Sequence, residues 1–209
     1  MRLQHVKWWL LLVGAMLAFW ALLAGPDVLF GVDLGKWGTA LLVTVAWVSM
    51  FAVSQAPPGE AEHGLSPGEW KAWVGVAFML AATGYFLAKA HVFAEGPVAD
   101  NYGARAVGRN LVLLLVAWSV LLGVLGARWK GRVQEDERDR EIEKQAAGWG
   151  RGGLMFVVIG LAVMLAFSPA DRLAWATHLM IANLLVFALM WGWLCEYAAT
   201  AVMYWRDRQ

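Results

Sequence analysis

The stretch NLVLLLVAWSVLLGVLGA, from Asn110 to Ala127, decides the fold because it is strongly apolar and contains no charged residue. The hydrocarbon core of a bilayer is about 30 Å thick, and a helix that rises about 1.5 Å per residue needs roughly 20 apolar residues to cross it. Lipid offers no partner to exposed backbone N–H and C=O groups, so an apolar run of this length forms a helix. The stretch therefore predicts a transmembrane helix.

Five further runs have the same character, and with the first they fill most of the chain. The 209 residues are 60% hydrophobic with a mean hydropathy of +0.55, which excludes an ordinary water-soluble protein. We expect a single membrane domain over residues 1–209, an all-α polytopic transmembrane bundle of about six spans. A cleaved signal peptide is the competing interpretation of the first span, and the continuing apolar pattern favours a retained anchor. The predicted spans are Trp8–Ala24, Gly38–Ser54, Ala72–Phe93, Asn110–Ala127, Gly153–Phe167 and Ala174–Tyr204.

The distribution of Lys and Arg sets the expected orientation, because cytoplasmic loops of membrane proteins are enriched in these residues. With the N-terminus in the cytoplasm, twelve of the 17 basic residues fall on the inner side and five on the outer side. Both chain ends are therefore predicted to be cytoplasmic. The five outer residues are Lys36, Lys89, Arg105, Arg109 and Arg172.

The longest polar stretch, residues 128–152, is predicted to be cytoplasmic. Its centre combines good helix formers with opposite charges at helical neighbour spacing, such as Asp136 with Arg140, so we expect a short solvated helix that ends at Gly148. Acidic and basic residues nearly balance, which disfavours nucleic-acid binding. The segment is interpreted as a solvated connector, and the alternative is a docking surface for a protein partner.

A resemblance rests on this segment and on the end of the chain. Asp136-Glu-Arg-Asp-Arg-Glu-Ile142, followed by two spans and Tyr204-Trp-Arg-Asp-Arg208, resembles an uncharacterised family of small bacterial membrane proteins. The similarity covers about Glu135–Arg208, and the family's more usual tyrosine with paired arginines is interrupted by Trp205 and Asp207. It implies a bacterial cytoplasmic (inner) membrane location and assigns no activity.

Ionisable groups at membrane depth are costly and mark candidate sites. His91 lies at the outer end of the third span, and His178 lies about one turn into the sixth, with Asn183 deeper. If these two helices are neighbours, the histidines suit a metal ion or bis-histidine haem, although we favour ordinary interfacial histidines. No third metal ligand has suggestive spacing, and the sequence identifies neither a metal site nor a cofactor.

Three more residues complete the candidate set. Glu196 lies near the inner boundary of the sixth span, where it has either a structural or a ligand-contacting role. Arg105 and Arg109 lie in the second outer loop, and we expect them to line the mouth of any outer cavity. We predict no catalytic residues.

The absence of a catalytic motif and the small size of the loops favour a non-enzymatic component that binds a partner protein, membrane lipid or an apolar ligand. The alternatives are a substrate-binding membrane subunit of a small-molecule transporter, for which midplane polarity is sparse, and a haem-bearing electron carrier. The single cysteine, Cys195, cannot form an intramolecular disulfide. The sequence leaves open whether the protein is an oligomer.

Overall fold

The computed structural model describes residues 2–25, 28–29, 31–54, 66–94, 101–129, 137–173 and 175–207. This part of the chain is helical apart from one small antiparallel hairpin, so the all-α class is confirmed. The α-helices are α1 (Arg2–Leu23), α2 (Leu34–Ser54), α3 (Pro67–Lys89), α4 (Tyr102–Trp129), α5 (Glu137–Phe167) and α6 (His178–Asp207). Two 3₁₀ helices follow α3 and α5, η2 (Ala90–Ala94) and η3 (Ala170–Leu173).

The hairpin lies between α1 and α2 and joins β1 (Val28–Leu29) to β2 (Val32–Asp33). Val28 pairs with Asp33 and Leu29 with Val32, which leaves a two-residue connection. Gly31 in that connection has a φ of 80°, a conformation that tight hairpin turns favour and that glycine adopts without strain.

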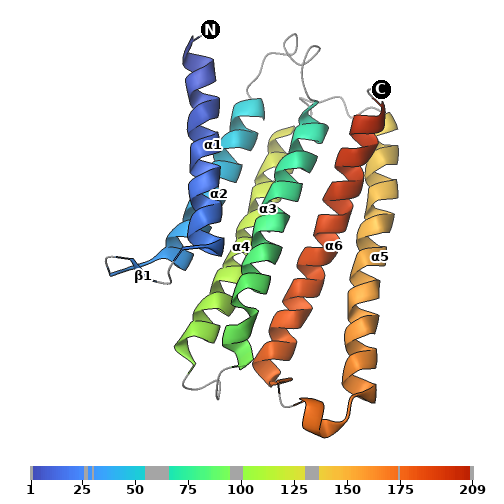
Figure 1. Ribbon diagram of the computed structural model, residues 1–209. Coiled ribbons are helices and arrows are strands. Elements are labelled where there is room, and N and C mark those ends of the chain that lie inside the picture. Colours follow the sequence, from blue (N-terminus) through green and yellow to red (C-terminus); the bar gives the residue numbers. More distant parts are fainter. Residues whose placement is uncertain are drawn as a thin grey trace.

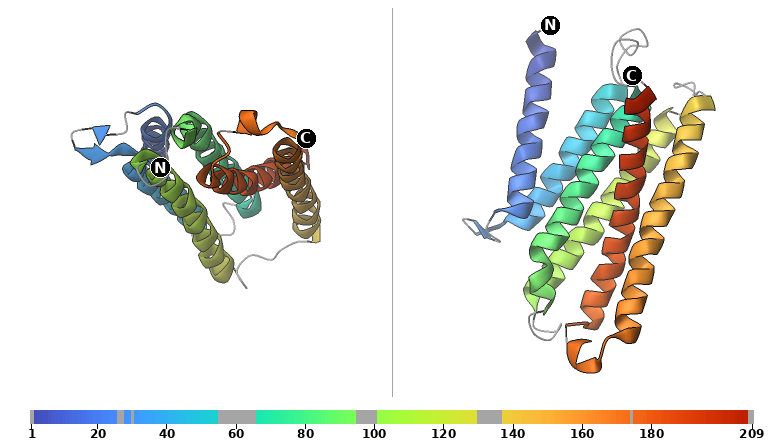
Figure 2. Two further views of the ribbon diagram at one scale, coloured as in Figure 1. Left: turned by 90° about the horizontal axis from the view of Figure 1, so that it is seen from below. Right: turned by 45° about the vertical axis from the view of Figure 1, so that its right-hand side comes forward.

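The helices run alternately up and down, so each consecutive pair is antiparallel (Figure 1). α1 and α5 lie at opposite edges, with α2, α3, α4 and α6 between them (Figures 1 and 2). The first and last described residues lie at the same end of the bundle (Figure 1). α6 packs against α5 on one side and α3 on the other, while α1 packs mainly against α2.

Five helices are long and apolar enough to cross a membrane: α2, α3, α4, α5 and α6. The apolar part of α1, Trp9–Leu23, is shorter. The bundle therefore has the character of a multi-pass membrane protein. Large apolar side chains cover its outside, among them Phe156 and Phe167 of α5, which are 79% and 83% exposed.

Helices α2, α3 and α4 begin earlier than the predicted spans because polar caps, rather than the first apolar residue, fix their starts, whereas α6 begins at His178, later than the predicted Ala174. Asp33 Oδ1 accepts from Lys36 N at 2.9 Å at the start of α2, and Ser66 Oγ accepts from Glu69 N at 3.1 Å at the start of α3. Asn101 Oδ1 accepts from Ala104 N at 2.8 Å before α4. Each cap satisfies a backbone N–H that has no partner within the helix.

The predicted helix end at Gly148 is wrong, because α5 continues from its charged start through Gly148 to Phe167. The glycines in this region are helical, and two of them pack closely against α6. A Cβ at Gly150 would lie 2.9 Å from Glu196 Cβ, and a Cβ at Gly153 would lie 2.7 Å from Cys195 Sγ. Close helix packing, rather than helix termination, accounts for these two glycines. Residues 130–136 of the predicted charged segment lie outside the described residues.

The core is most densely filled with aromatic side chains between α3, α4 and α6. Phe78 of α3 stacks on Trp118 of α4 with ring centroids 4.6 Å apart, and both side chains are fully buried. Trp118 meets Tyr197 of α6 edge-on at 5.6 Å, and its Nε1 donates to the Tyr197 hydroxyl at 2.9 Å. This layer joins three helices through one hydrogen-bonded aromatic cluster.

Candidate ligand-binding pocket

A pocket of about 480 Å³ lies between α3, α5 and α6, near the end of the bundle that carries both chain ends. Arg140, Glu143 and Lys144 on its α5 wall are exposed, so the pocket opens to the molecular surface. The α3 and α6 walls carry Lys71 and Glu196. Charges of both signs therefore surround one cavity at the edge of an otherwise apolar bundle.

The pocket owes its shape to glycines on α3 that admit tyrosine rings from α6. A Cβ at Gly68 would lie 2.5 Å from the Tyr204 hydroxyl oxygen, and a Cβ at Gly75 would lie 2.6 Å from Tyr197 Cγ. The two glycines and the two tyrosines are each seven residues apart, which keeps both pairs on the facing sides of the two helices. Tyr197 and Tyr204 are thereby held as the α6 wall of the pocket.

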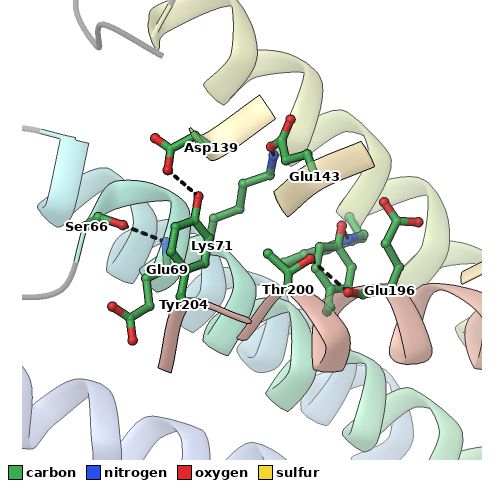
Figure 3. A network of polar contacts seen from close by, with 10 residues as sticks. Ser66, Glu69, Lys71, Asp139, Glu143, Glu196, Thr200 and Tyr204 are labelled. Carbon is green, nitrogen blue, oxygen red and sulfur yellow. Dashed lines mark hydrogen bonds and ion pairs between the residues drawn. The ribbon is translucent and has the colours of Figure 1, made fainter. Parts of the chain in front are cut away.

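Two polar contacts tie the α5 wall to its neighbours, as Figure 3 shows. Lys71 Nζ of α3 pairs with Glu143 Oε1 of α5 at 3.3 Å. The Tyr204 hydroxyl donates to Asp139 Oδ1 at 2.9 Å. Above them, Arg138 Nε pairs with Asp207 Oδ2 at 2.9 Å in an exposed ion pair. These contacts fix the spacing of α5 from α3 and α6 at the pocket's mouth.

Two charged side chains of the pocket make no hydrogen bond or ion pair within the described part of the chain. Lys144 is exposed on α5, and the Glu196 carboxylate is partly buried on α6. The charges of Lys71, Glu143 and Arg151 act on the Glu196 carboxylate, but none of these side chains is paired with it. Its backbone oxygen accepts from the Thr200 hydroxyl at 2.8 Å (Figure 3), a contact that leaves the carboxylate unused.

The pocket ends at the aromatic layer of the core. Tyr197 belongs both to the pocket wall and to the cluster with Trp118 and Phe78. Because Trp118 and Phe78 are fully buried, the layer separates the pocket from the opposite half of the bundle. A ligand in the pocket thus meets charged groups at its sides and an aromatic floor.

Of the six residues predicted as candidates, Glu196 lines this pocket. His91 in η2 and His178 at the start of α6 are both exposed and lie toward the opposite end of the bundle (Figure 1). α3 and α6 are neighbours, as the paired-histidine hypothesis requires. Within the described residues, no group of three or more His, Cys, Asp or Glu is placed to hold a metal ion.

The remaining three candidates also lie away from the pocket. Arg109 Nη2 is 3.8 Å from Asp33 Oδ2, and both Arg105 and Arg109 are exposed. Asn183 is buried, donates from Nδ2 to Leu179 O at 2.8 Å and packs against Gly108 of α4. Asn183 therefore serves helix packing in this arrangement.

Sequence reasoning did not single out Lys71, Glu143 or Tyr204 as site residues. They come from three segments that are far apart in the sequence, and only the packing of α3, α5 and α6 brings them together. The seven-residue spacing of Gly68 with Gly75 and of Tyr197 with Tyr204 was not among the patterns used to predict site residues, and it is the signal that could have pointed to this seam.

Comparisons with protein-family models, with curated proteins and with solved structures each found no match to this chain.

Proposed function

We propose that this protein is a non-enzymatic component of the bacterial cytoplasmic membrane that binds a ligand in the pocket between α3, α5 and α6. The observation that carries the proposal is the cavity of about 480 Å³ with charges of both signs at the rim of an apolar bundle. Polar groups in such a place are costly to maintain unless they are paired or meet a ligand. The resemblance of residues 135–208 to a bacterial membrane family supports the location.

The proposed topology has six spans and both chain ends in the cytoplasm, which places the pocket mouth on the cytoplasmic side. The helices alternate in direction, and the first and last described residues lie at the same end of the bundle (Figure 1). Both observations support an even number of crossings. The excess of Lys and Arg on that side supports the orientation. Single cysteines at Asp207 and Asp171, introduced into a Cys195→Ser background, test it by labelling in intact cells. Labelling of Asp171→Cys alone by an impermeant reagent is expected, and labelling of Asp207→Cys would overturn the topology.

A binding role rather than an enzymatic one is supported by the hydroxyl groups around the pocket. The Tyr204 hydroxyl donates to Asp139, the Thr200 hydroxyl donates to Glu196 O, and the Tyr197 hydroxyl accepts from Trp118. A nucleophilic hydroxyl needs a neighbouring general base that takes its proton, whereas the Thr200 and Tyr197 hydroxyls have a backbone carbonyl and an indole N–H as partners. These groups are used to hold helices together.

The transport alternative is favoured by one observation, a pocket with an exposed α5 wall near one end of the bundle and an aromatic layer beneath it. Passage of a substrate would require Tyr197 and Trp118 to separate. Docking of a partner protein on the charged start of α5 is a second proposal for what this protein binds. Haem at His91 and His178 stays a prediction that a Soret band in the purified protein would test.

Mass spectrometry of the small molecules retained after gentle detergent extraction tests the pocket directly. Ala147→Trp places a large ring in the pocket, because Ala147 lines it from α5. Ala162→Trp is the matched control, since Ala162 lies on the exposed apolar part of the same helix. We expect a retained molecule in the wild type and in Ala162→Trp that is lost in Ala147→Trp. Equal retention by all three proteins would show that the pocket is not the binding site.

A further inference from the structure

We propose that the pocket's ligand is a water-borne zwitterion in which an amine and an anionic group are separated by a short aliphatic linker. This inference rests on the proposed function and specifies its ligand. It is drawn from three features of the pocket: which of its charges are already paired, how far apart the unpaired ones lie, and what lines the space between them.

The first feature is charge pairing. Lys71 is neutralised by Glu143 at 3.3 Å, so this pair contributes little net charge to a ligand. Arg140, the fifth charged residue of the lining, is engaged in an interaction of its own. Lys144 and Glu196 remain, an ammonium and a carboxylate that make no hydrogen bond or ion pair with the described residues. A ligand that carries one anionic and one cationic group satisfies both, whereas a singly charged ligand leaves one of them without a partner.

The second feature is the separation of these two groups along the helices. The contact of Asp139 with Tyr204 and the packing of Gly150 on Glu196 fix the register of antiparallel α5 and α6. In that register Lys144 lies three to six residues from the level of Glu196, which corresponds to roughly 5–9 Å along the helix axes at about 1.5 Å per residue. An amine and an acid joined by a chain of about four to six carbon atoms span this distance.

The third feature is the lining between the two charges. Ala72 of α3, Ala147 of α5 and the ring of Tyr197 provide apolar surface there. Such surface suits a methylene linker, because burying each CH₂ group is favourable in water. Starting from the mouth of the pocket, the ligand's anionic group therefore meets Lys144, its apolar linker follows, and its amine meets Glu196.

That order also favours a dissolved ligand over a membrane phospholipid. In the register fixed by the Asp139–Tyr204 contact and by the packing of Gly150 on Glu196, Glu196 lies deeper than Lys144, as measured from the end of the bundle where α5 begins and α6 ends. The ligand's amine must therefore enter first and point toward the bilayer centre. In a zwitterionic phospholipid the amine points toward water and the phosphate lies beneath it, which is the opposite sense.

Three probes of equal chain length test the ligand class by calorimetry on the full-length protein in detergent. They are 6-aminohexanoate, which carries both charges, hexanoate, which carries the anionic group, and hexylamine, which carries the cationic group. We expect 6-aminohexanoate to bind at least about tenfold more tightly than either singly charged probe, since each charged contact contributes about that factor. Equal affinities for the three probes would overturn the proposal.

Two substitutions assign the charges. Glu196→Gln should remove the advantage of 6-aminohexanoate over hexanoate, and Lys144→Gln should remove its advantage over hexylamine. Glu141→Gln, on the exposed surface of α5 outside the pocket, is the control and should leave all three affinities unchanged. Lys144 is exposed, so its variant is expected to fold even if Glu196→Gln does not. Retention of the full advantage in Lys144→Gln would contradict the assignment.

The same measurements separate this inference from the proposed function. If Ala147→Trp loses a retained molecule but the three probes bind alike, the pocket is a binding site and the zwitterion is the wrong ligand. Competition between 6-aminohexanoate and nanodiscs rich in phosphatidylethanolamine, absent with phosphatidylglycerol, would show a lipid ligand and overturn the water-borne assignment. If Ala147→Trp changes neither retention nor probe binding, the proposed function itself fails.

Discussion

α6 is held by two seams that use glycine in different ways. Against α3, Gly68 and Gly75 make room for the rings of Tyr204 and Tyr197. Against α5, glycines face small groups and backbone, since a Cβ at Gly150 would lie 3.1 Å from Gly192 O. The first seam buries aromatic surface, and the second brings two helix backbones close together.

The difference between the two seams explains where the pocket forms. The tyrosines of the α3 seam extend beyond it, because Tyr197 accepts from Trp118 of α4 and Tyr204 donates to Asp139 of α5. The α5 seam holds one helix edge to another and leaves the outer face of α5 exposed. The pocket lies where the seams meet, with a rigid aromatic side and a side held mainly by close backbone packing.

The largest effect is expected at the aromatic seam. Gly75→Ala places a Cβ 2.6 Å from the buried Tyr197 ring, at a ring atom that cannot move without displacing Trp118. Overpacking of this kind costs about 1–3 kcal/mol, measurable as a lower midpoint of thermal unfolding in detergent. The control is Gly123→Ala in α4, where nothing lies within 4 Å of the added Cβ. Comparable losses in both variants would show that the ring contact is not the cause.

Removal of a hydroxyl from the same seam should have a somewhat smaller effect. Tyr197→Phe keeps the ring but leaves the buried Trp118 Nε1 without its acceptor at 2.9 Å. The loss of unfolding free energy should be about 1–2 kcal/mol, the cost of an unsatisfied buried donor. The double variant with Trp118→Phe should be less destabilised than the sum of the single variants. Additive losses would show that the two side chains do not interact.

The glycine seam should respond more weakly to an added methyl group. Gly150→Ala meets Glu196 Cβ at 2.9 Å and Gly192 O at 3.1 Å, and α5 can move outward because its far face is exposed. A loss of about 1 kcal/mol is expected, partly offset by the better helix propensity of alanine. Gly152→Ala on the same helix meets nothing within 4 Å and should be neutral or stabilising. Equal behaviour of the two variants would remove the distinction between the faces of α5.

The smallest effect is expected at the exposed ion pair that joins the start of α5 to the end of α6. Arg138→Gln removes the 2.9 Å contact with Asp207, and both side chains are about half exposed. Solvent screening limits such pairs to less than about 1 kcal/mol. The difference from wild type should vanish in high salt, and a loss that persists there would indicate a role other than charge pairing.

Apolarity in the sequence was enough to locate the helices but not to place their ends. Each predicted span overlaps a helix, because burial in lipid depends on composition that the sequence carries directly. The starts were missed at α2, α3 and α4, where Asp33, Ser66 and Asn101 cap the helices before the apolar run begins. Capping depends on single polar residues, which a search for apolar windows ignores.

Only one residue of the candidate site, Glu196, was predicted from the sequence. Glu196 was singled out because a carboxylate within an apolar span is costly at any packing arrangement. Lys71 and Glu143 become site residues only because α3 and α5 both pack against α6, which no local pattern around either residue specifies. The error at Gly148 came from reading a glycine as a helix end, whereas α5 runs on through Gly148, and close packing on α6 accounts for Gly150 and Gly153.

The length of α5 has a consequence for the mouth of the pocket. Its 31 residues reach about 46 Å, some 16 Å more than the hydrocarbon layer, so in the proposed topology its charged first turns would stand among the lipid headgroups of the cytoplasmic leaflet. Anionic lipids create a negative surface potential there, which attracts free cations and repels free anions. A molecule with no net charge neither gains nor loses by that potential, so access for a zwitterion would be insensitive to the lipid composition of the leaflet.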